Sequence, residues 1–335
     1  MNTPPSRGSL APFLIWLLLF YLGWLSLVLA GGHLQSVLEH WPIAMAMLGG
    51  SYVAGSTPMG GGSVGFPVLV LVMDLPATLG RDFSFAVQSV GMTSASIYIL
   101  SRRQPLEWPM LRAALVGALI GTPLGVLFVA PLASDLVIKL LFATVLCSFG
   151  LLHLRRINEI TGYHGITPTD LAFDNKAGFI VGLLGSMTIA SITGVGVDMM
   201  IYMVLVLLCH ADLKIAIPTS VILMAFTSLV GIAVKLLAGS VQPGTFENWL
   251  AAAPVVALGA PFGALVVNRL GRRPTLFFVS LLCVGQFVWT LVHERSVLSG
   301  WSLAATLLGV VLFLLAFQDL YQRGNQLARR KRPAP

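Results

Sequence analysis

The stretch Thr57-Pro58-Met59-Gly60-Gly61-Gly62-Ser63-Val64-Gly65 interrupts an apolar run that is otherwise long enough to cross a membrane. A proline followed by a glycine cluster does not continue a helix, because proline lacks the backbone N–H and glycine loses the most backbone entropy on ordering. Broken backbone at membrane depth persists only where protein or a water-filled cavity satisfies its polar groups. The stretch therefore predicts a helix break that belongs to a transport site.

The composition places the whole chain in a bilayer. Its 335 residues are 56% hydrophobic and 10% charged, with a mean hydropathy of +0.88, whereas soluble domains are about a quarter charged. The net charge of +7 comes from basic residues that cluster between apolar runs and at the C-terminus, so membrane topology explains it and we expect no nucleic-acid partner. The lipid bilayer is the expected partner of this surface.

Two apolar runs have a length that fits neither one span nor two. Ile43–Met73 has 31 residues and Ala177–Cys209 has 33, and each contains a glycine-rich break near its middle. At 1.5 Å per residue they would form about 46–50 Å of helix, while one span of the hydrocarbon core needs roughly 30 Å. Either each run folds into a re-entrant hairpin of two half-helices, or each is one broken and strongly tilted span.

The distribution of positive charge favours the hairpins. If the N-terminus is cytoplasmic and both runs return to the side they entered from, the basic loops fall inside, in accordance with the positive-inside rule, and the exceptions are the single residues Arg81 and Arg295. These loops are Arg102-Arg103, Arg155-Arg156, Arg269/Arg272/Arg273 and the tail Arg329-Arg330-Lys331-Arg332. The same arrangement gives the two halves opposite orientations, as in secondary transporters with inverted repeats.

We therefore predict an all-α polytopic membrane protein with two inverted repeats, each a re-entrant hairpin followed by three transmembrane helices, and one extra helix at each end. The predicted units are an N-terminal helix and loop (1–42), a first repeat (43–154), a cytoplasmic linker (155–176), a second repeat (177–293), and a last helix with its basic cytoplasmic tail (294–335). We retain the first apolar helix, Leu10–Ala30, as a span, because it is longer than the apolar core of a typical signal peptide.

An internal repeat supports two halves. The segment Gly121-Thr122-Pro123-Leu124-Gly125 matches Gly259-Ala260-Pro261-Phe262-Gly263 at an offset of 259 − 121 = 138. The glycines at 60–62 match the segment 194–198 at an offset near 136, and at 136 Ser84 meets Ser220. The two matches together are more specific than either alone.

The second half of each broken run begins at the glycines, where its first N–H groups lack intrahelical partners and the helix dipole is positive. Two such ends facing each other form an anion site, and glycines let an anion approach the backbone closely. The alternative is that the glycines serve only close helix packing. The predicted substrate-binding residues at the breaks are Thr57, Gly60, Gly61, Gly62, Ser63, Thr193, Gly194 and Gly196.

The helices after the breaks add polar groups. Ser84 and Gln88 share a helix face by their i, i+4 spacing, and Thr219 and Ser220 begin the corresponding helix of the second half. We include all four in the predicted substrate site. Asp198, at the repeat position of Gly62, is either a proton-coupling group or the N-cap of the second half-helix.

No enzyme signature accompanies these features. The sequence contains no phosphate-binding loop, no H-E-x-x-H and no G-x-S-x-G, and its three cysteines lie far apart in apolar runs. We predict neither catalytic residues nor a metal site nor a cofactor.

With Gly60-Gly61-Gly62, Phe66-Pro67-Val68-Leu69 and the second break at Gly194-Val195-Gly196, the chain resembles the TauE/SafE family of sulfite and organosulfonate exporters over roughly 43–292. In the second motif it departs from the family pattern, with Val197 and Asp198 in place of glycines and Met203 in place of the proline. The resemblance implies transport of a small sulfur-containing or other organic anion, driven by an ion gradient.

We therefore expect a secondary transporter that moves sulfite, a sulfonate or a related anion by alternating access, with a proton or sodium as coupling ion. The alternative is a cation or metal transporter or channel with Asp198 as ligand. The expected location is the bacterial inner membrane, with both termini cytoplasmic. The sequence leaves a homo-oligomer open.

Overall fold

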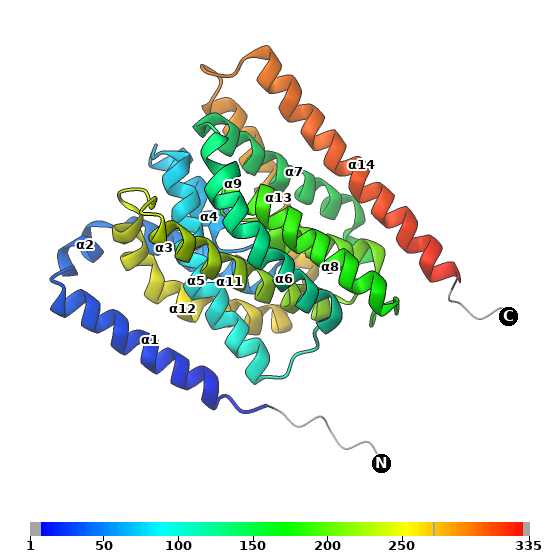
Figure 1. Cartoon of the computed structure of the whole chain (residues 1–335), viewed down its shortest axis with the longest axis horizontal. Helices are drawn as coiled ribbons and strands as arrows, with labels where there is room; N and C mark the ends of the chain where they lie inside the picture. Colours follow the sequence, from blue (N-terminus) through cyan, green and yellow to red (C-terminus); the bar gives the residue numbers. More distant parts are fainter. Residues whose placement is uncertain (1–7, 271, 331–335) are drawn as a thin grey trace.

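The computed structural model describes residues 8–270 and 272–330, and within them every regular element is a helix (Figure 1). The long helices are α1 (Ala11–Ala30), α3 (Trp41–Ser56), α5 (Ala77–Ser101), α6 (Trp108–Leu124), α7 (Asp135–Ile160), α8 (Leu171–Gly185), α11 (Leu213–Leu237), α12 (Thr245–Leu270), α13 (Arg272–His293) and α14 (Gly300–Arg330). The shorter elements are α2 (Leu34–Glu39), α4 (Gly62–Pro67), α9 (Ser191–Thr193), α10 (Val197–Met203), four π-helical turns (Val68–Val72, Gly125–Val129, Ser186–Ala190 and Val204–Leu208) and one 3₁₀ turn, Ala130–Leu132.

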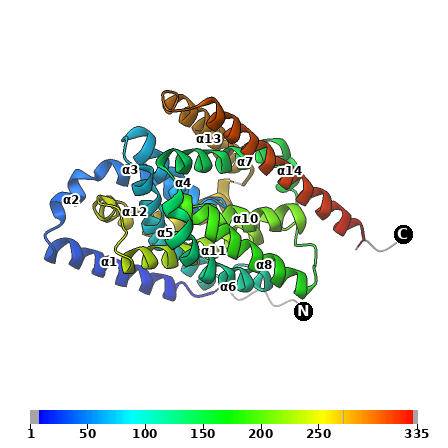
Figure 2. The same ribbon diagram turned by 45° about the horizontal axis from the view of Figure 1, so that its top comes forward.

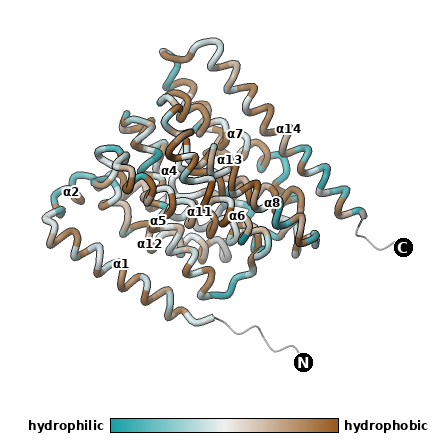
Figure 3. Tube along the Cα trace, in the orientation of Figure 1, coloured by the Kyte–Doolittle hydropathy of each residue, from teal (hydrophilic) through white to brown (hydrophobic). Residues whose placement is uncertain are grey.

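Among the described residues, nine helical segments are long and apolar enough to cross a membrane. The protein is a polytopic helical membrane protein, as its composition predicts. Apolar residues cover the outer faces of the helices, while hydrophilic residues gather at their ends (Figure 3). The last five residues of the predicted basic tail, 331–335, lie outside the described residues, as do residues 1–7.

Helices α1 and α14 lie along opposite edges of the bundle (Figures 1 and 2). Helix α1 contacts α5 and α12, whereas α14 contacts α7 and the π-helical turn Val204–Leu208. Both expose most of their leucines, as helices that border lipid do.

Two parts of the chain repeat the same backbone geometry. Asp74 and His210, at an offset of 210 − 74 = 136, both have a positive φ, of 52° and 47°. Each follows a π-helical turn, Val68–Val72 or Val204–Leu208, and each precedes a helix of 25 residues, α5 or α11. The repeat is therefore a property of the backbone as well as of the glycine pattern.

The chain reverses direction at both breaks. A Cβ added to Gly50 in α3 would lie 3.2 Å from the Cβ of Val64 in α4, and one added to Gly185 would lie 3.3 Å from Val197. In a straight helix Gly50 and Val64 would be about 21 Å apart. The two arms of each broken segment thus pack against each other as a hairpin does.

The second hairpin has a longer first arm than we expected. Helix α8 begins at Leu171 rather than near Ala177, and the segment Leu171–Thr193 is 23 residues long, so this arm is longer than the half-helix that the sequence predicts. The reason is that the polar start of the helix is accommodated: the carboxylate of Asp174 accepts a hydrogen bond from the hydroxyl of Thr169. Since α7 also extends to Ile160, only residues 161–170 connect the two helices.

The paired glycine-proline-glycine segments are helix crossings. A Cβ on Gly121 of α6 would lie 2.2 Å from the carbonyl oxygen of Leu183 in α8, and one on Gly263 of α12 would lie 2.5 Å from that of Tyr52 in α3. The last-but-one helix of each half therefore packs closely on the first arm of the other half's hairpin. This close packing joins the halves and brings the two breaks together.

Candidate functional site

The first break leaves backbone donors without partners. Helix α3 ends at Ser56, Thr57 is extended, and α4 begins at Gly62. The hydroxyl of Ser63 donates to the carbonyl of Gly60 at 2.7 Å, and that of Thr57 donates to the carbonyl of Val53. Within the described residues, the N–H groups of Gly61 and Gly62 form no hydrogen bond. Buried donors of this kind are costly unless a ligand or water meets them.

The second break depends on two glycines with positive φ. Gly194 has φ 79° and Gly196 has φ 107°, and residues that carry a Cβ rarely adopt this backbone conformation. Thr193 donates its hydroxyl to the carbonyl of Ile189 at 2.8 Å, and the same hydroxyl lies 2.9 Å from the carbonyl oxygen of Val195. The hydroxyl predicted as a substrate donor is therefore engaged in shaping the loop.

Asp198 stands in the first turn of α10 and is completely buried. Its Oδ1 accepts hydrogen bonds from the N–H groups of Gly196 (3.1 Å) and Met199 (3.0 Å). Its Oδ2 is buried and forms no hydrogen bond of normal geometry in the described part of the chain, and the backbone N–H of Gly60 faces the carboxylate. One oxygen thus satisfies the start of α10, in the manner of a cap, while the other lies toward the first break.

Helix α5 supplies the side chain of Gln88, which connects the two breaks. The amide nitrogen of Gln88 donates to the carbonyl of Ser84 and to that of Gly194, both at 2.8 Å. The hydroxyl of Ser84 donates to the carbonyl of Gly80, within its own helix. Gln88 is 1% exposed, and its Oε1 has no hydrogen-bond partner among the described residues.

The two breaks meet at this glutamine. A Cβ on Gly60 would lie 1.5 Å from Oε1 of Gln88 and 3.5 Å from Oδ2 of Asp198. A Cβ on Gly62 would lie 2.7 Å from both Ser84 and Val195. At Gly60 and Gly62 a larger residue would therefore clash with side chains of α5, and at Gly62 also with the second break.

Comparison with known protein families decides the family. The model of the family described as Sulfite exporter TauE/SafE matches residues 42–288. The chain belongs to this family. A search of the curated proteins and a search of the solved structures each found no match.

The part of the chain that carries the TauE/SafE match includes both breaks and leaves out α1, α2 and α14. The family is one of membrane transporters, which agrees with the nine apolar segments of the described residues.

The hydroxyls of two predicted site residues, Thr219 and Ser220, are engaged by other partners. The hydroxyl of Thr219 donates to the carbonyl of Ile215 and accepts a hydrogen bond from the N–H of Glu107 at 3.1 Å. The hydroxyl of Ser220 donates to the carbonyl of Ile217. Within residues 8–270 and 272–330, no hydrogen bond joins either residue to a break, in contrast to Gln88 of the first half. The repeat position of Gln88 is held by Met224, which has no amide to form such a bond.

A buried ionic cluster beside the second break was not predicted as part of the site. Arg81 and Lys235 both pair with Oδ1 of Asp82, at 3.0 and 3.2 Å, and all three side chains are at least nine-tenths buried. A Cβ on Gly194 would lie 2.5 Å from the carbonyl oxygen of Arg81. The adjacent Arg81-Asp82 in an otherwise apolar helix was the available sequence signal. Lys235 lies in the last turn of α11, and the structure shows that it pairs internally with Asp82.

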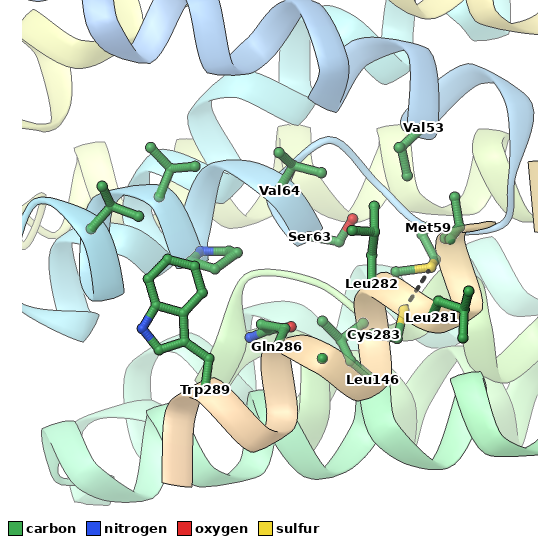
Figure 4. Close-up of a pocket in the computed structure, with 15 residues that line it drawn as sticks. Val53, Met59, Ser63, Val64, Leu146, Leu281, Leu282, Cys283, Gln286 and Trp289 are labelled. Carbon is green, nitrogen blue, oxygen red and sulfur yellow. Dashed lines mark hydrogen bonds between the residues drawn. The ribbon is translucent and has the colours of Figure 1, made fainter. Parts of the chain in front are cut away.

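An apolar groove of about 500 Å³ reaches the first break from the outside, between α13 and the first hairpin. Figure 4 shows Ser63 and Met59 facing Cys283, Gln286 and Trp289 across it. The sulfur atoms of Met59 and Cys283 lie 3.6 Å apart. Its lining is almost entirely apolar, so the groove suits hydrocarbon chains better than a small anion.

Proposed function

We propose that this TauE/SafE protein is a secondary transporter that moves a small anion, such as sulfite or a sulfonate, across the cytoplasmic membrane by alternating access. The observation that carries the proposal is the meeting of the two breaks, where the N–H groups of Gly61 and Gly62 have no hydrogen-bond partner in the described part of the chain. Unpaired N–H groups at a helix start bind anions without a basic side chain.

In the proposed arrangement the two hairpins are re-entrant and enter from opposite sides, the first from outside and the second from the cytoplasm. The contacts between the arms of each hairpin and the repeat of backbone geometry at 136 residues support this reading. Both termini are then cytoplasmic, and residues 43–154 and 177–293 form the inverted repeats.

The anion would bind at the first break. Ser63 and Thr57 bond to backbone carbonyls, so we assign recognition chiefly to the N–H groups of Gly61 and Gly62. The start of α10 is less suited to an anion, because Asp198 already accepts from its N–H groups. The buried cluster of Arg81, Lys235 and Asp82 has a net charge of one positive unit, which would favour the approach of an anion.

The described conformation is closed around this site. The cavity that touches Gly61 and Gln88 has a volume of about 10 Å³, which is room for about one water molecule. Sulfite is larger, so in the proposed cycle the breaks separate before the anion binds. Such a change of access around a fixed site is the expected mechanism of a transporter with paired hairpins.

The alternative function is transport of a cation or metal with Asp198 as ligand, and the unpaired Oδ2 favours it. Among the described residues, however, no three His, Cys, Asp or Glu side chains gather where they could hold a metal ion. For coupling we retain a proton or sodium, and for assembly a homo-oligomer, as parts of the proposal.

Flux of radiolabelled sulfite and sulfonates into proteoliposomes tests the function. We expect uptake that saturates with sulfite and that falls sharply when Gly61 is replaced by leucine, while Gly49→Leu, on the exposed face of α3, preserves it. A protein that moves no anion, or that moves a cation dependent on Asp198, would contradict the proposal.

A further inference from the structure

Two buried acceptor oxygens lie at the first break. In the part of the chain that the structure describes, Oδ2 of Asp198 and Oε1 of Gln88 form no hydrogen bond of normal geometry. The backbone N–H of Gly60 faces the Asp198 carboxylate. Asp198 is 0% exposed and Gln88 is 1% exposed, so bulk water does not reach these atoms, and the cavity of about 10 Å³ beside Gln88 holds at most about one water molecule. Unsatisfied buried acceptors are rare in native proteins and require a physical reason.

The orientation of the Gln88 amide follows from its partners. Its nitrogen lies 2.8 Å from two carbonyl oxygens, those of Ser84 and Gly194. Carbonyl oxygens accept only, so the atom between them must be the NH₂ group. Rotating the amide would place two oxygens against Oε1, and the unpaired atom is therefore an oxygen.

The two oxygens lie close together. The same added Cβ on Gly60 would be 1.5 Å from Oε1 and 3.5 Å from Oδ2, so the oxygens are at most about 5 Å apart. Two acceptors at this separation repel each other unless a proton or a cation lies between them. An ionised carboxylate that has one oxygen without a full hydrogen bond is also unfavourable in a dry interior.

A proton fits the site better than a metal cation. Hard cations such as Mg²⁺ and Ca²⁺ take about six or more oxygen ligands. The nearby carbonyl oxygens are already engaged: that of Gly194 accepts from Gln88, and that of Gly60 accepts from Ser63. Two free oxygens form no cage, whereas a single proton on one of them satisfies both.

Among the residues that the structure describes, no charged group pairs with Asp198. On the elements packed against α10 or near it, the titratable side chains bond elsewhere. His153 of α7 lies 3.0 Å from the hydroxyl of Tyr202 of α10, Asp174 of α8 accepts from Thr169, and Lys235 of α11 pairs with Asp82, as does Arg81 of α5. Lys214 is at the opposite end of α11 from Lys235. None of them forms an ion pair or hydrogen bond with Asp198 in the described residues.

We propose that Asp198 and Gln88 form the binding site of the coupling proton, in which the O–H on Oδ2 of Asp198 donates to Oε1 of Gln88. The inference rests on the proposed transport function for its role, and on geometry alone for the site. Gly60 covers the pair, and the next residues, Gly61 and Gly62, are the proposed anion donors. Motion of the first break therefore exposes the proton and the anion site together.

Movement of the first break would release the proton from Asp198. When the first break moves away, the O–H bond at Oδ2 breaks and the proton passes to water. The remaining carboxylate keeps the hydrogen bonds that Oδ1 accepts from Gly196 and Met199. These two bonds stabilise the ionised form, so both protonation states are accessible during a cycle.

Infrared difference spectroscopy of the purified full-length protein during a pH titration tests the site without any transport. We expect a protonated-carboxyl band that disappears at alkaline pH, is absent in Asp198→Asn and moves in frequency in Gln88→Met. Asp319→Asn, whose carboxylate is on the exposed part of α14, should keep the band. If the band is unchanged in Asp198→Asn, the proton site does not exist.

Asp198→Asn is expected to fold, because the amide oxygen can still accept from Gly196 and Met199 while its NH₂ donates to Gln88. The neutral amide of Asp198→Asn mimics the protonated carboxyl group at every pH. In proteoliposomes, a pH gradient should accelerate sulfite flux by the wild type and leave flux by Asp198→Asn unchanged. Comparison under one gradient cancels the titration of sulfite itself.

The outcomes separate the two proposals. Without sulfite flux by the wild type, the transport function fails, while the carboxyl band still decides the proton site. Flux that depends on sodium and not on the pH gradient, in the wild type, overturns the coupling role of the proton.

Discussion

Gln88 of the first half donates a hydrogen bond of 2.8 Å to the carbonyl oxygen of Gly194 in the second half. The bond joins two segments that are 106 residues apart and crosses between the halves at their point of contact. The corresponding position of the second half is Met224, which cannot reciprocate. The two breaks are therefore chemically unequal, although their backbones repeat.

Replacing Gln88 by methionine should destabilise the protein by about 1–3 kcal/mol, because the carbonyl of Gly194 is left buried without its donor. Chemical unfolding in detergent, followed by tryptophan fluorescence, measures the change. The control is Ser89→Ala on the same helix, since the hydroxyl of Ser89 bonds only to the carbonyl of Ala86. Equal effects of the two substitutions would show that the bond between the halves contributes nothing special.

Gly60→Ala should both destabilise the protein, by about 1–3 kcal/mol from overpacking, and reduce anion flux. The added methyl group would lie 1.5 Å from Oε1 of Gln88, whose amide is held by two other hydrogen bonds and cannot withdraw freely. Gly49→Ala is the matched control in α3, because no atom lies within 4 Å of its added Cβ. In that control alanine should be neutral or slightly stabilising, as its helix propensity is higher.

Local chemistry made the breaks predictable, whereas the contacts around them depend on packing. Pro58 and the glycines at 60–62 exclude a continuous helix whatever surrounds them, and the offset near 136 recurs in the backbone at Asp74 and His210. The pairing of Asp82 with Lys235 has no local signal. It arises only because α5 packs along α11, 153 residues further on.

The assignment of Thr219 and Ser220 to the site rests on the repeat alone. Equivalence with the first half suggested that they belong to the site, but each hydroxyl bonds to a carbonyl of its own helix, and Thr219 also holds the N–H of Glu107. Serine and threonine in apolar helices commonly form such bonds. A backbone repeat does not imply a repeat of side-chain roles.

Asp82→Asn should be far more destabilising than the loss of an exposed ion pair. Arg81 and Lys235 both depend on Oδ1 of Asp82 and would be left as buried cations without a counter-charge. Breaking a buried pair in this way costs about 3–5 kcal/mol. Thermal unfolding of Asp82→Asn against Asp319→Asn measures the difference, because Asp319 pairs with Arg323 on an exposed surface. A similar midpoint for both variants would contradict the importance of the cluster.

Gly324→Val should detach the end of α14 from the second hairpin. A Cβ on Gly324 would lie 2.2 Å from the carbonyl oxygen of Leu207, and backbone cannot yield as a side chain can. We expect trypsin to cut near Arg323 several times faster than in the wild type, with the helical bundle otherwise intact. Gly300→Ala at the start of α14 is the control, because its added Cβ meets no atom within 4 Å. Unchanged cleavage of Gly324→Val would show that this contact does not hold the helix.

His210 should make folding stability depend on pH. It lies in the loop after the second hairpin, stacks on Tyr163 with ring centroids 4.7 Å apart, and its Nε2 is buried without a partner among the described residues. Burial lowers its pKa from 6.5, and Glu159 opposes this only in part. Because the unfolded chain then binds the proton more readily, the free energy of unfolding should fall as the pH drops below about 6.5 towards the folded pKa. His210→Asn keeps a residue that tolerates the positive φ of 47° and removes the titration. The loss between neutral and mildly acidic pH, measured by denaturant unfolding, should therefore be smaller in this variant than in the wild type, and an equal loss would assign the effect to other groups.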